Sequence, residues 1–366
     1  MGRPAVLIFH RPAGAGEPAL VRILADVRTE LARRQAALFE RAGATAPTFV
    51  DEWYEDKAFG EVIRRLAPAG GGVIVLGSGA VARLNLADAR RLVAVAASGR
   101  AEALTNNRYS SDIVALGRAA VLKKLPALPS DNALPRWLEE IAGVSVDELP
   151  GRDRLALDLD TPLDVCLAAI APGAAPWLRA TTDEARLAVP RLDDLRALVR
   201  DPTKELLVFG RSGSRTLGWL ERNVRCRVRF LAEERGMRAS SPLAIAGRGK
   251  APLRQPTSTL SLLLEGRGPS ALAQIVAELA DAAIIDTRVL LAARLGSDES
   301  GWPPQADRFA SDLHDHAAVK DTWLKELTRS AAAARQPILL GSHSLVGPGV
   351  KLVVGAQGDW SAPKRA

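Results

Sequence analysis

Short, uninterrupted apolar runs alternate along this chain with longer segments in which apolar residues recur at helical spacing. Residues 5–9 and 73–76 are runs of the first kind, and residues 18–42 form a segment of the second kind with charged side chains on its outer face. A strand that is apolar on both faces is typical of a parallel sheet covered by helices on both sides. The repeated order of strand, turn and helix therefore predicts an α/β fold with a mostly parallel sheet.

A segment rich in proline and glycine at residues 172–176 (Pro-Gly-Ala-Ala-Pro) divides the chain into two halves. Such a composition neither continues a helix nor builds a strand. A chain of 366 residues with 47% hydrophobic content can bury two cores. We therefore predict one α/β domain over residues 1–174 and a second α/β domain over residues 175–366. Near the end of the second domain we expect two strands, at residues 337–340 and 350–354.

The composition argues against several classes of protein. The two cysteines, Cys166 and Cys226, are too few for a disulfide scaffold and leave little basis for a zinc site. No window of eighteen residues is apolar and free of charge, and the first eleven residues lack the longer apolar stretch of a signal peptide. We expect a cytoplasmic protein without a membrane partner, and the sequence is compatible with a homo-oligomer.

The positive charge is concentrated in the second half of the chain. Residues 1–175 carry 21 basic and 21 acidic side chains, so the net charge of +7 comes entirely from residues 176–366. Residues 211–254 alone hold eleven basic and three acidic side chains. This cluster indicates an anionic partner, although a solvated arginine-rich surface would have the same composition. Nucleic acid is not the favoured partner, because only Trp219 and Phe230 could stack on bases there.

The sequence after residue 209 predicts a phosphate site. Residues 210–216 (Gly-Arg-Ser-Gly-Ser-Arg-Thr) follow an apolar run at 206–209 and lead into a helix. The first N–H groups of a helix are unpaired and carry the positive end of its dipole, which favours a phosphate. A tight turn closed by a serine or threonine cap would explain the same residues. The residues that we expect to bind a phosphorylated ligand are Arg211, Ser212, Ser214 and Arg215.

The next segment, residues 224–231, alternates strictly between apolar residues and arginines. Its arginines would lie about 7 Å apart on one face of a strand and would repel one another unless an anion or a carboxylate pairs with them. We expect Arg225, Arg227 and Arg229 to add to the phosphate site unless acidic residues of the same sheet neutralise them.

Two carboxylates, Asp158 and Asp160, follow an apolar segment that we interpret as a strand. Side chains at positions i and i+2 of a strand point to the same side, as the oxygen ligands of a divalent cation must. We expect both residues to bind a metal and to be catalytic. Thr161 and Pro162 are typical of the first turn of a helix, so helix capping is the alternative explanation of this segment.

Polar residues also follow two other predicted strands of the first half. Open α/β sheets bind their ligands at the carboxyl ends of the strands, where amide and hydroxyl groups can contact a base or a sugar. Ordinary turn chemistry, followed by a helix capped by Ser111 or Asp112, is the alternative. The residues that we expect to bind a nucleotide are Gly77, Ser78, Asn106, Asn107 and Ser110.

Residues 157–164 (Leu-Asp-Leu-Asp-Thr-Pro-Leu-Asp) resemble the Asp-hydrophobic-Asp-Thr-Pro-x-Asp signature of nucleotidyltransferases with the GT-A fold. The molybdenum-cofactor nucleotidyltransferases and the 2-phospholactate guanylyltransferases are the members in question. The resemblance covers about the first half of the chain. It implies a mostly parallel sheet of the nucleotide-diphospho-sugar transferase (GT-A) type, a nucleotide substrate, and Mg²⁺ held by Asp158 and Asp160.

Two motifs of these enzymes are missing from the sequence. Residues 10–16 (His-Arg-Pro-Ala-Gly-Ala-Gly) stand in place of the glycine-rich loop and its lysine, and no lysine precedes Lys57. Residues 77–80 (Gly-Ser-Gly-Ala) stand where a Gly-Asp-x-Pro metal motif is expected. Two functions therefore stay open: magnesium-dependent nucleotidyl transfer to a phosphorylated small molecule, and non-catalytic binding of a nucleotide or phosphorylated metabolite.

A further constellation is predicted in the second half. Asp286 and His343 each follow a predicted strand and would meet at one edge of a sheet, with Ser342 or Ser344 nearby. Base, orienting carboxylate and nucleophile are the parts of a hydrolytic triad. The flanking sequence lacks the Gly-x-Ser-x-Gly motif, so this interpretation rests on position alone.

Overall fold

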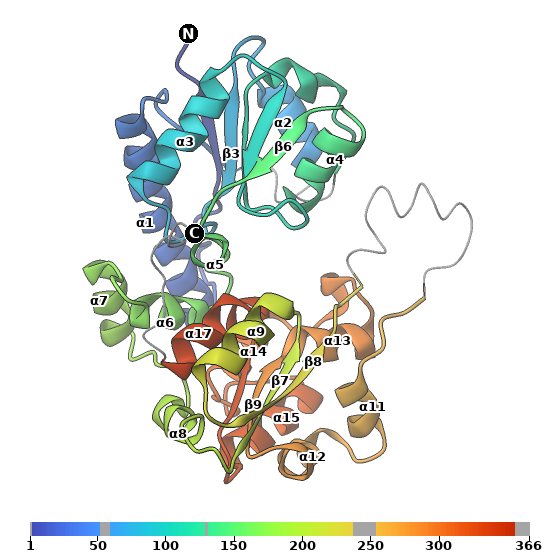
Figure 1. The fold of residues 1–366 in the computed structure, drawn as a ribbon. Helices are drawn as coiled ribbons and strands as arrows, with labels where there is room; N and C mark the ends of the chain where they lie inside the picture. Colours follow the sequence, from blue (N-terminus) through green and yellow to red (C-terminus); the bar gives the residue numbers. More distant parts are fainter. Residues whose placement is uncertain (1, 52–58, 129–130, 237–253, 356–366) are drawn as a thin grey trace. The chain divides into compact units, whose positions relative to one another are not determined.

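A computed structural model describes residues 2–51, 59–128, 131–236 and 254–355. The chain forms two compact units, which are described separately (Figure 1). Among the described residues, the first unit comprises 2–17 and 24–160, and the second comprises 18–23 and 161–355. The segment at 172–176 lies within the second unit, and the division into domains 1–174 and 175–366 stays a prediction.

The first unit contains a six-stranded sheet in the order β2-β1-β3-β5-β4-β6. Neighbouring strands are parallel except at β5, which is antiparallel to both β3 and β4. The predicted α/β class with a mostly parallel sheet is therefore confirmed. The strands are β1 (Ala5–Phe9), β2 (Thr48–Val50), β3 (Val73–Gly77), β4 (Glu102–Thr105), β5 (Ile113–Leu116) and β6 (Ser145–Glu148).

Helices cover both faces of this sheet, as the apolar runs predict (Figure 1). Val6 and Ile8 of β1 face a core shared with α1 (Ala19–Ala42) and α3 (Leu86–Ala97). Leu7 and Phe9 of the same strand face the opposite core, shared with α2 (Phe59–Leu66) and α4 (Leu134–Glu140). The remaining helical segments are short: η1 (Ala119–Lys124), η2 (Asp131–Ala133) and α5 (Arg152–Leu155).

The second unit contains a four-stranded, fully parallel sheet in the order β10-β9-β7-β8. The connection after β7 leads to β8 on one side of the sheet, and the connection after β9 leads to β10 on the other side. The chain connections therefore diverge between the neighbouring strands β7 and β9. In open α/β sheets this divergence marks the crevice where ligands bind. The strands are β7 (Glu205–Gly210), β8 (Arg227–Ala232), β9 (Ala282–Asp286) and β10 (Ile338–Gly341).

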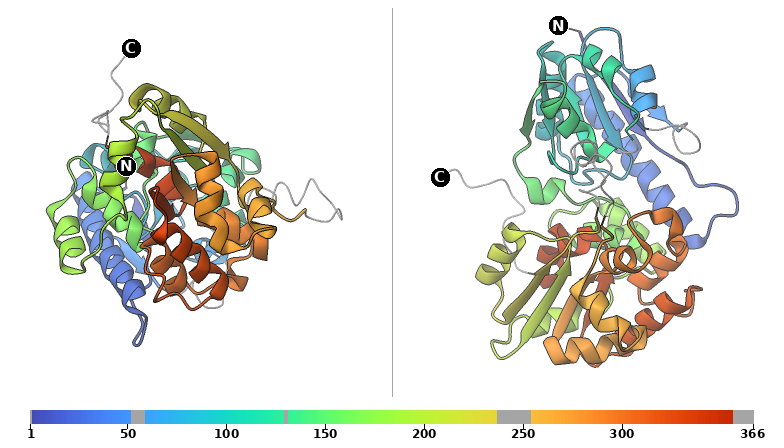
Figure 2. Two further views of the ribbon diagram at one scale, coloured as in Figure 1. Left: turned by 90° about the horizontal axis from the view of Figure 1, so that it is seen from below. Right: turned by 90° about the vertical axis from the view of Figure 1, so that its right-hand side faces the viewer.

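One large core joins Leu207 and Phe209 of β7 to helices α11, α12, α13 and α15. Figure 2 shows helices of this part of the chain, in orange to red, beside the strands. Helices α9 and α16 also contact the strands, and α17 packs on α6, α8 and α9. The helices of this unit are α6 (Pro162–Ile170), α7 (Pro176–Glu184), α8 (Leu192–Leu198), α9 (Ser214–Asn223), α11 (Thr259–Glu265), η3 (Pro269–Ala271), α12 (Leu272–Leu279), α13 (Thr287–Leu295), η4 (Glu299–Gly301), α14 (Gln305–Asp312), α15 (Thr322–Ala333), α16 (His343–Val346) and α17 (Pro348–Val354).

Three local predictions were wrong. Residues 350–354 form part of helix α17 rather than a strand, because Pro348 starts a helix. Every residue of α17 is buried, so its sequence is as apolar as that of a buried strand, and the two cannot be told apart by pattern. The segment after Asp112 is strand β5 rather than a helix. Residues 156–160 form no strand. Within the described ranges, no helix combines the length and hydropathy that a membrane span requires.

Candidate functional site

The polar residues predicted at the edge of the first sheet lie close together. The N–H of Gly77, at the end of β3, faces the carbonyl of Asp112, just before β5, at 3.4 Å. The Asn106 amide, just after β4, donates to the Asp112 carboxylate at 2.6 Å and accepts from the Asp112 N–H at 3.1 Å. Asp158 Oδ1 accepts from the N–H of Val81 at 2.9 Å. The sheet thus brings together the segments that the sequence singled out.

Asp158 lies in the interior and keeps only 5% of its surface exposed. Burial, the first cause, raises the pKa of this carboxyl well above its ordinary value, and the charges of Asp112 and Asp160 and a hydrogen bond with Asp112 raise it further. Asp158 is therefore a buried carboxyl with a raised pKa that contacts Asp112.

Asp160 has a different environment from Asp158. Its side chain is half exposed and forms an ion pair with Arg28 Nη2 at 2.8 Å. Arg28 Nε donates to the carbonyl of Leu159 at 2.6 Å. Because residues 156–160 do not form a strand, the rule that carboxylates at i and i+2 share one side does not apply to them. One carboxyl points into the unit and the other lies at its surface.

The segment that carries the family resemblance holds the loop after β3 in place. The N–H of Leu159 donates to the carbonyl of Gly79 at 2.9 Å, and that of Ala82 donates to the carbonyl of Leu157. A Cβ atom on Gly79 would lie 2.8 Å from the Leu159 carbonyl oxygen, so this close approach requires glycine. Asp158 adds its bond to Val81, whose φ is +44°.

The capping interpretation of Thr161 is confirmed in the second unit. Thr161 Oγ1 accepts from the N–H of Asp164, and the Asp164 carboxylate accepts from the N–H of Thr161 at 2.8 Å. Pro162 occupies the first turn of α6. This capping box accounts for the Thr-Pro-x-Asp part of the motif without a ligand.

The expected nucleotide-binding residues differ in their availability. Asn106 is buried and uses its whole amide, because it donates to Asp112 and Leu155 and accepts from Asp112 and Ile113. Asn107 accepts from the N–H of Tyr109, and Ser110 donates to Asn132 at 2.7 Å. Asn106 therefore fixes the β4–β5 connection, whereas Ser110 lies on the exposed part of that loop.

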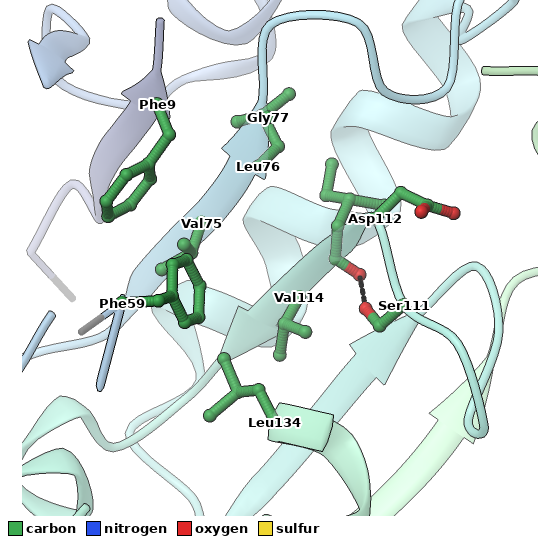
Figure 3. A pocket seen from close by; sticks show the side chains of 10 residues that line it. Phe9, Phe59, Val75, Leu76, Gly77, Ser111, Asp112, Val114 and Leu134 are labelled. Carbon is green, nitrogen blue, oxygen red and sulfur yellow. Dashed lines mark hydrogen bonds between the residues drawn. The ribbon is translucent and has the colours of Figure 1, made fainter. Parts of the chain in front are cut away.

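A small cavity of about 40 Å³ lies beside this edge (Figure 3). Phe9, Phe59 and Leu134 supply apolar walls, and the Asp112 carboxylate points away from the two aromatic rings. Ser111 donates to the Ile113 carbonyl at 3.1 Å. A cavity of this size holds a few water molecules but no nucleotide, because ligand pockets measure roughly 300–1,000 Å³.

His10 is a residue that sequence reasoning missed. It follows β1 directly, is buried, and its Nε2 lies 3.1 Å from Thr29 Oγ1. Because the Thr29 hydroxyl donates to the Ala25 carbonyl, it accepts from His10 Nε2–H, and the His10 Nδ1 atom finds no partner in the described residues. Burial, followed by the charges of Arg28 and Arg33, lowers the pKa of His10. Its position directly after an apolar run was the available signal.

In the second unit, Gly210 and Arg211 connect the ends of β7 and β9. Gly210 has a φ of +122°, and a Cβ atom there would lie 2.3 Å from Asp286 Cβ. Arg211 Nε and Nη2 bind the Asp286 carboxylate at 2.6 and 3.1 Å. Burial alone would raise the pKa of Asp286, but the Arg211 guanidinium outweighs it and lowers that pKa. Arg211 therefore spans the point where the chain connections diverge, as half of a buried ion pair.

Two arginines of β8 do not join the Arg211 segment. Arg227 and Arg229 pair with Glu205 at 3.4 and 3.1 Å. Glu205 lies opposite Arg227 at the amino end of the sheet, whereas Gly210 lies opposite Ala232 at the carboxyl end. Arg227 and Arg229 therefore do not support the phosphate site, because they share one carboxylate of their own sheet at its other end. The basic residues at 237–253 lie outside the described residues.

Of the four residues predicted to bind phosphate, two are available. Ser212 donates to the Val346 carbonyl at 2.6 Å, and Arg211 is bound to Asp286. Ser214 and Arg215 are exposed in the first turn of α9, and no described side chain caps this helix at its Gly213 N-cap. The start of α9 thus keeps free N–H groups beside an arginine.

Asp286 is not positioned as the orienting carboxylate of a triad. The Asp286 carboxylate accepts from Arg211 and from the N–H of Arg288, so it orients these groups. Ser342 accepts from the N–H of Ser344 and lies 3.4 Å from Asp164. The charge of His343 lowers the pKa of Asp286, but the Asp286 carboxylate forms its side-chain hydrogen bonds with Arg211.

Magnesium does not fit Asp158 as this residue lies. Mg²⁺ keeps several water ligands and needs accessible oxygens, whereas Asp158 is buried and already bonded to Val81 and Asp112. Asp160 is paired with Arg28. Over the described ranges, no three His, Cys, Asp or Glu side chains are grouped as a metal site requires.

Comparisons with known proteins add little. No family model matches the sequence, and no curated protein does. A solved structure with some similarity is that of Rv0371c from Mycobacterium tuberculosis H37Rv, which is 18% identical. The match covers 45% of this chain and 96% of that chain, with a TM-score of 0.27. At this level the similarity supports no statement about fold or function.

Proposed function

We propose that the protein has a nucleotidyltransferase-like first half of GT-A type and binds a nucleotide or another phosphorylated small molecule without catalysing nucleotidyl transfer. The observation that carries this proposal is the environment of Asp158. The carboxyl that would hold the catalytic metal is buried and bonded to Val81 and Asp112. Metal-dependent transfer requires that carboxylate to be open to the metal and the substrate.

The topology supports a ligand at the carboxyl edge of the first sheet. The chain connections diverge between β1 and β3, because β2 lies on one side of β1 and β3 on the other. Ligands of open α/β sheets bind outside such a point. Gly77 ends β3 there and Ser78 follows it, and Arg28, which is paired with Asp160, lies beside Gly79.

The second unit offers a phosphate position of the same kind. The start of α9 lies after β7, next to the divergence between β7 and β9. Its uncapped N–H groups and Arg215 favour a dianion. Each of the two edges would bind a ligand of its own.

A thermal-shift series with nucleoside triphosphates and sugar phosphates, each with and without Mg²⁺, tests the proposal. A ligand at 100 times its Kd stabilises the protein by about 2.7 kcal/mol. We expect a ligand that stabilises the protein equally with and without Mg²⁺, and equally in the Asp160→Asn variant. Stabilisation that requires Mg²⁺ and disappears in Asp160→Asn would instead support the alternative, magnesium-dependent nucleotidyl transfer. If no phosphorylated compound stabilises the protein, both functions are wrong.

A further inference from the structure

The second unit contains a cleft of about 570 Å³ that none of the motifs in the sequence indicates. Helix α6 forms its floor, α7 one wall, and residues 187–194, including the start of α8, the other wall. This volume lies within the range of small-molecule sites, roughly 300–1,000 Å³. The residues that the argument uses are Cys166, Ile170, Arg179, Asp183, Val189 and Asp193.

The cleft has an apolar floor with charged groups around it. Cys166 and Ile170 of α6 and Val189 of the wall are apolar or uncharged, and burial raises the pKa of the Cys166 thiol to about 12. Cys166 is therefore a neutral thiol that contributes surface rather than a nucleophile. A floor of this kind accepts the carbon chain of a ligand.

One charged pair at the rim is already satisfied within the protein. Arg191 Nε binds Asp194, and its two terminal nitrogens donate to the carbonyls of Ala334 and Arg335 at 2.9 and 3.1 Å. Arg191 also holds a left-handed backbone, with a φ of +52°, and Arg186 does so at +53°. Such conformations are costly for residues other than glycine, so the wall between Arg186 and Arg191 is fixed by its bonds rather than by local preference.

Three charged side chains of the cleft form few or no hydrogen bonds with the described residues. Arg179 makes one long hydrogen bond, from Nε to the Ala169 carbonyl at 3.4 Å. The carboxylates of Asp183 and Asp193 accept no hydrogen bond from the described residues. With Arg191 and Asp194 paired, the remaining charge of the cleft is one positive and two negative, which complements a ligand with one anionic and two cationic groups.

We propose that this cleft binds a basic amino acid or a similar diamino carboxylate. The ligand carboxylate pairs with the Arg179 guanidinium, and its two ammonium groups pair with Asp183 and Asp193. The methylene chain between them lies against Cys166 and Ile170 of the floor and Val189 of the wall. A phosphorylated ligand is excluded here, because Asp183 and Asp193 would repel it.

Isothermal titration of the full chain with L-lysine, L-ornithine and L-arginine tests this site. L-Glutamate and hexanoate are the comparison ligands, because one has the opposite charge and the other lacks the amines. We expect one of the basic amino acids to bind, and Arg179→Gln, Asp183→Asn and Asp193→Asn each to weaken it at least about tenfold. These side chains are exposed, and unchanged melting temperatures will show that the variants fold.

Glu184→Gln is the matched control, because Glu184 is the exposed neighbour of Asp183 on α7 and does not line the cleft. It should leave the affinity unchanged. The proposal is overturned if none of the three basic amino acids binds, if L-glutamate or hexanoate binds equally well, or if the cleft variants bind like Glu184→Gln. None of these results depends on the binding of phosphorylated ligands.

Discussion

At the residue scale, Asp158 decides how the family resemblance is interpreted. The sequence motif presents it as a metal ligand, whereas in the structure it is a buried carboxyl with a raised pKa, bonded to Val81 and Asp112. Burial of this kind depends on contacts with loops about 45 and 80 residues earlier in the sequence, at Asp112 and Val81. No local sequence pattern contains that information. The motif could therefore be found in the sequence, but the burial and the partners of Asp158 could not be predicted from it.

Asp158→Asn tests the protonation state through the pH dependence of stability. Because the pKa of Asp158 is raised in the folded protein, its carboxyl binds more protons in the folded state than in the unfolded state, and the contribution of Asp158 to the free energy of unfolding falls as pH rises above about 4. An asparagine keeps both hydrogen bonds and does not titrate. We expect chemical denaturation to show that the variant gains stability relative to the parent between pH 5 and pH 8.

The exposed Asp147→Asn is the control, and its stability should follow that of the parent at every pH. If Asp158→Asn also follows the parent, Asp158 is ionised in the folded protein and the metal-ligand interpretation regains its basis.

Gly210 gives a second prediction at this scale. With a φ of +122° and Asp286 Cβ 2.3 Å from an added Cβ, Gly210→Ala should lower the free energy of unfolding by about 3 kcal/mol or more. Gly213→Ala, three residues on, has an extended backbone and open space and should cost about 1 kcal/mol or less. Equal losses in urea denaturation would show that β7 and β9 do not approach as closely as described.

At the scale of elements, buried strands were predictable and some of their neighbours were not. The apolar runs of β1, β3, β7 and β9 indicate parallel strands because both of their faces are covered. Helix α17 has the same apolar character because it is buried on every side. Strand β5 follows a polar loop that is equally typical of a helix cap. The pairing of Arg227 and Arg229 with Glu205 depends on strand order, which local patterns do not determine.

The start of α9 gives a prediction for an element. Arg215→Ala removes the exposed guanidinium beside the free N–H groups of this helix and should weaken inorganic phosphate binding about tenfold at low salt. Arg222→Ala, in the last turn of the same helix, removes the same charge at the end where no phosphate is expected and should have little effect. If titrations give the two variants the same affinity for phosphate, the start of α9 is an ordinary turn and not a phosphate site.

At the scale of the whole molecule, the sequence allowed the α/β class to be predicted, together with the sheet edges that gather polar residues. Those edges follow from strand direction, because the ends of β3 and β4 lie beside the start of β5. The contacts that these polar residues make could not be predicted from the sequence. Asn106 is bound to Asp112 and to the Leu155 carbonyl, and Arg211 is bound to Asp286. Leu155 and Asp286 lie 49 and 75 residues further along the chain than the residues they bind.

The most direct test of the account is a pyrophosphate-release assay. The full chain is incubated with each nucleoside triphosphate, Mg²⁺ and a set of phosphorylated acceptors, beside Asp158→Asn and Asp160→Asn. We predict that the ligand identified by thermal shift binds while pyrophosphate stays at the level of a protein-free control, in the parent and in both variants. Magnesium-dependent release of pyrophosphate by the parent that is lost in Asp158→Asn would contradict the account, because it would require Asp158 to be an ionised metal ligand during the reaction.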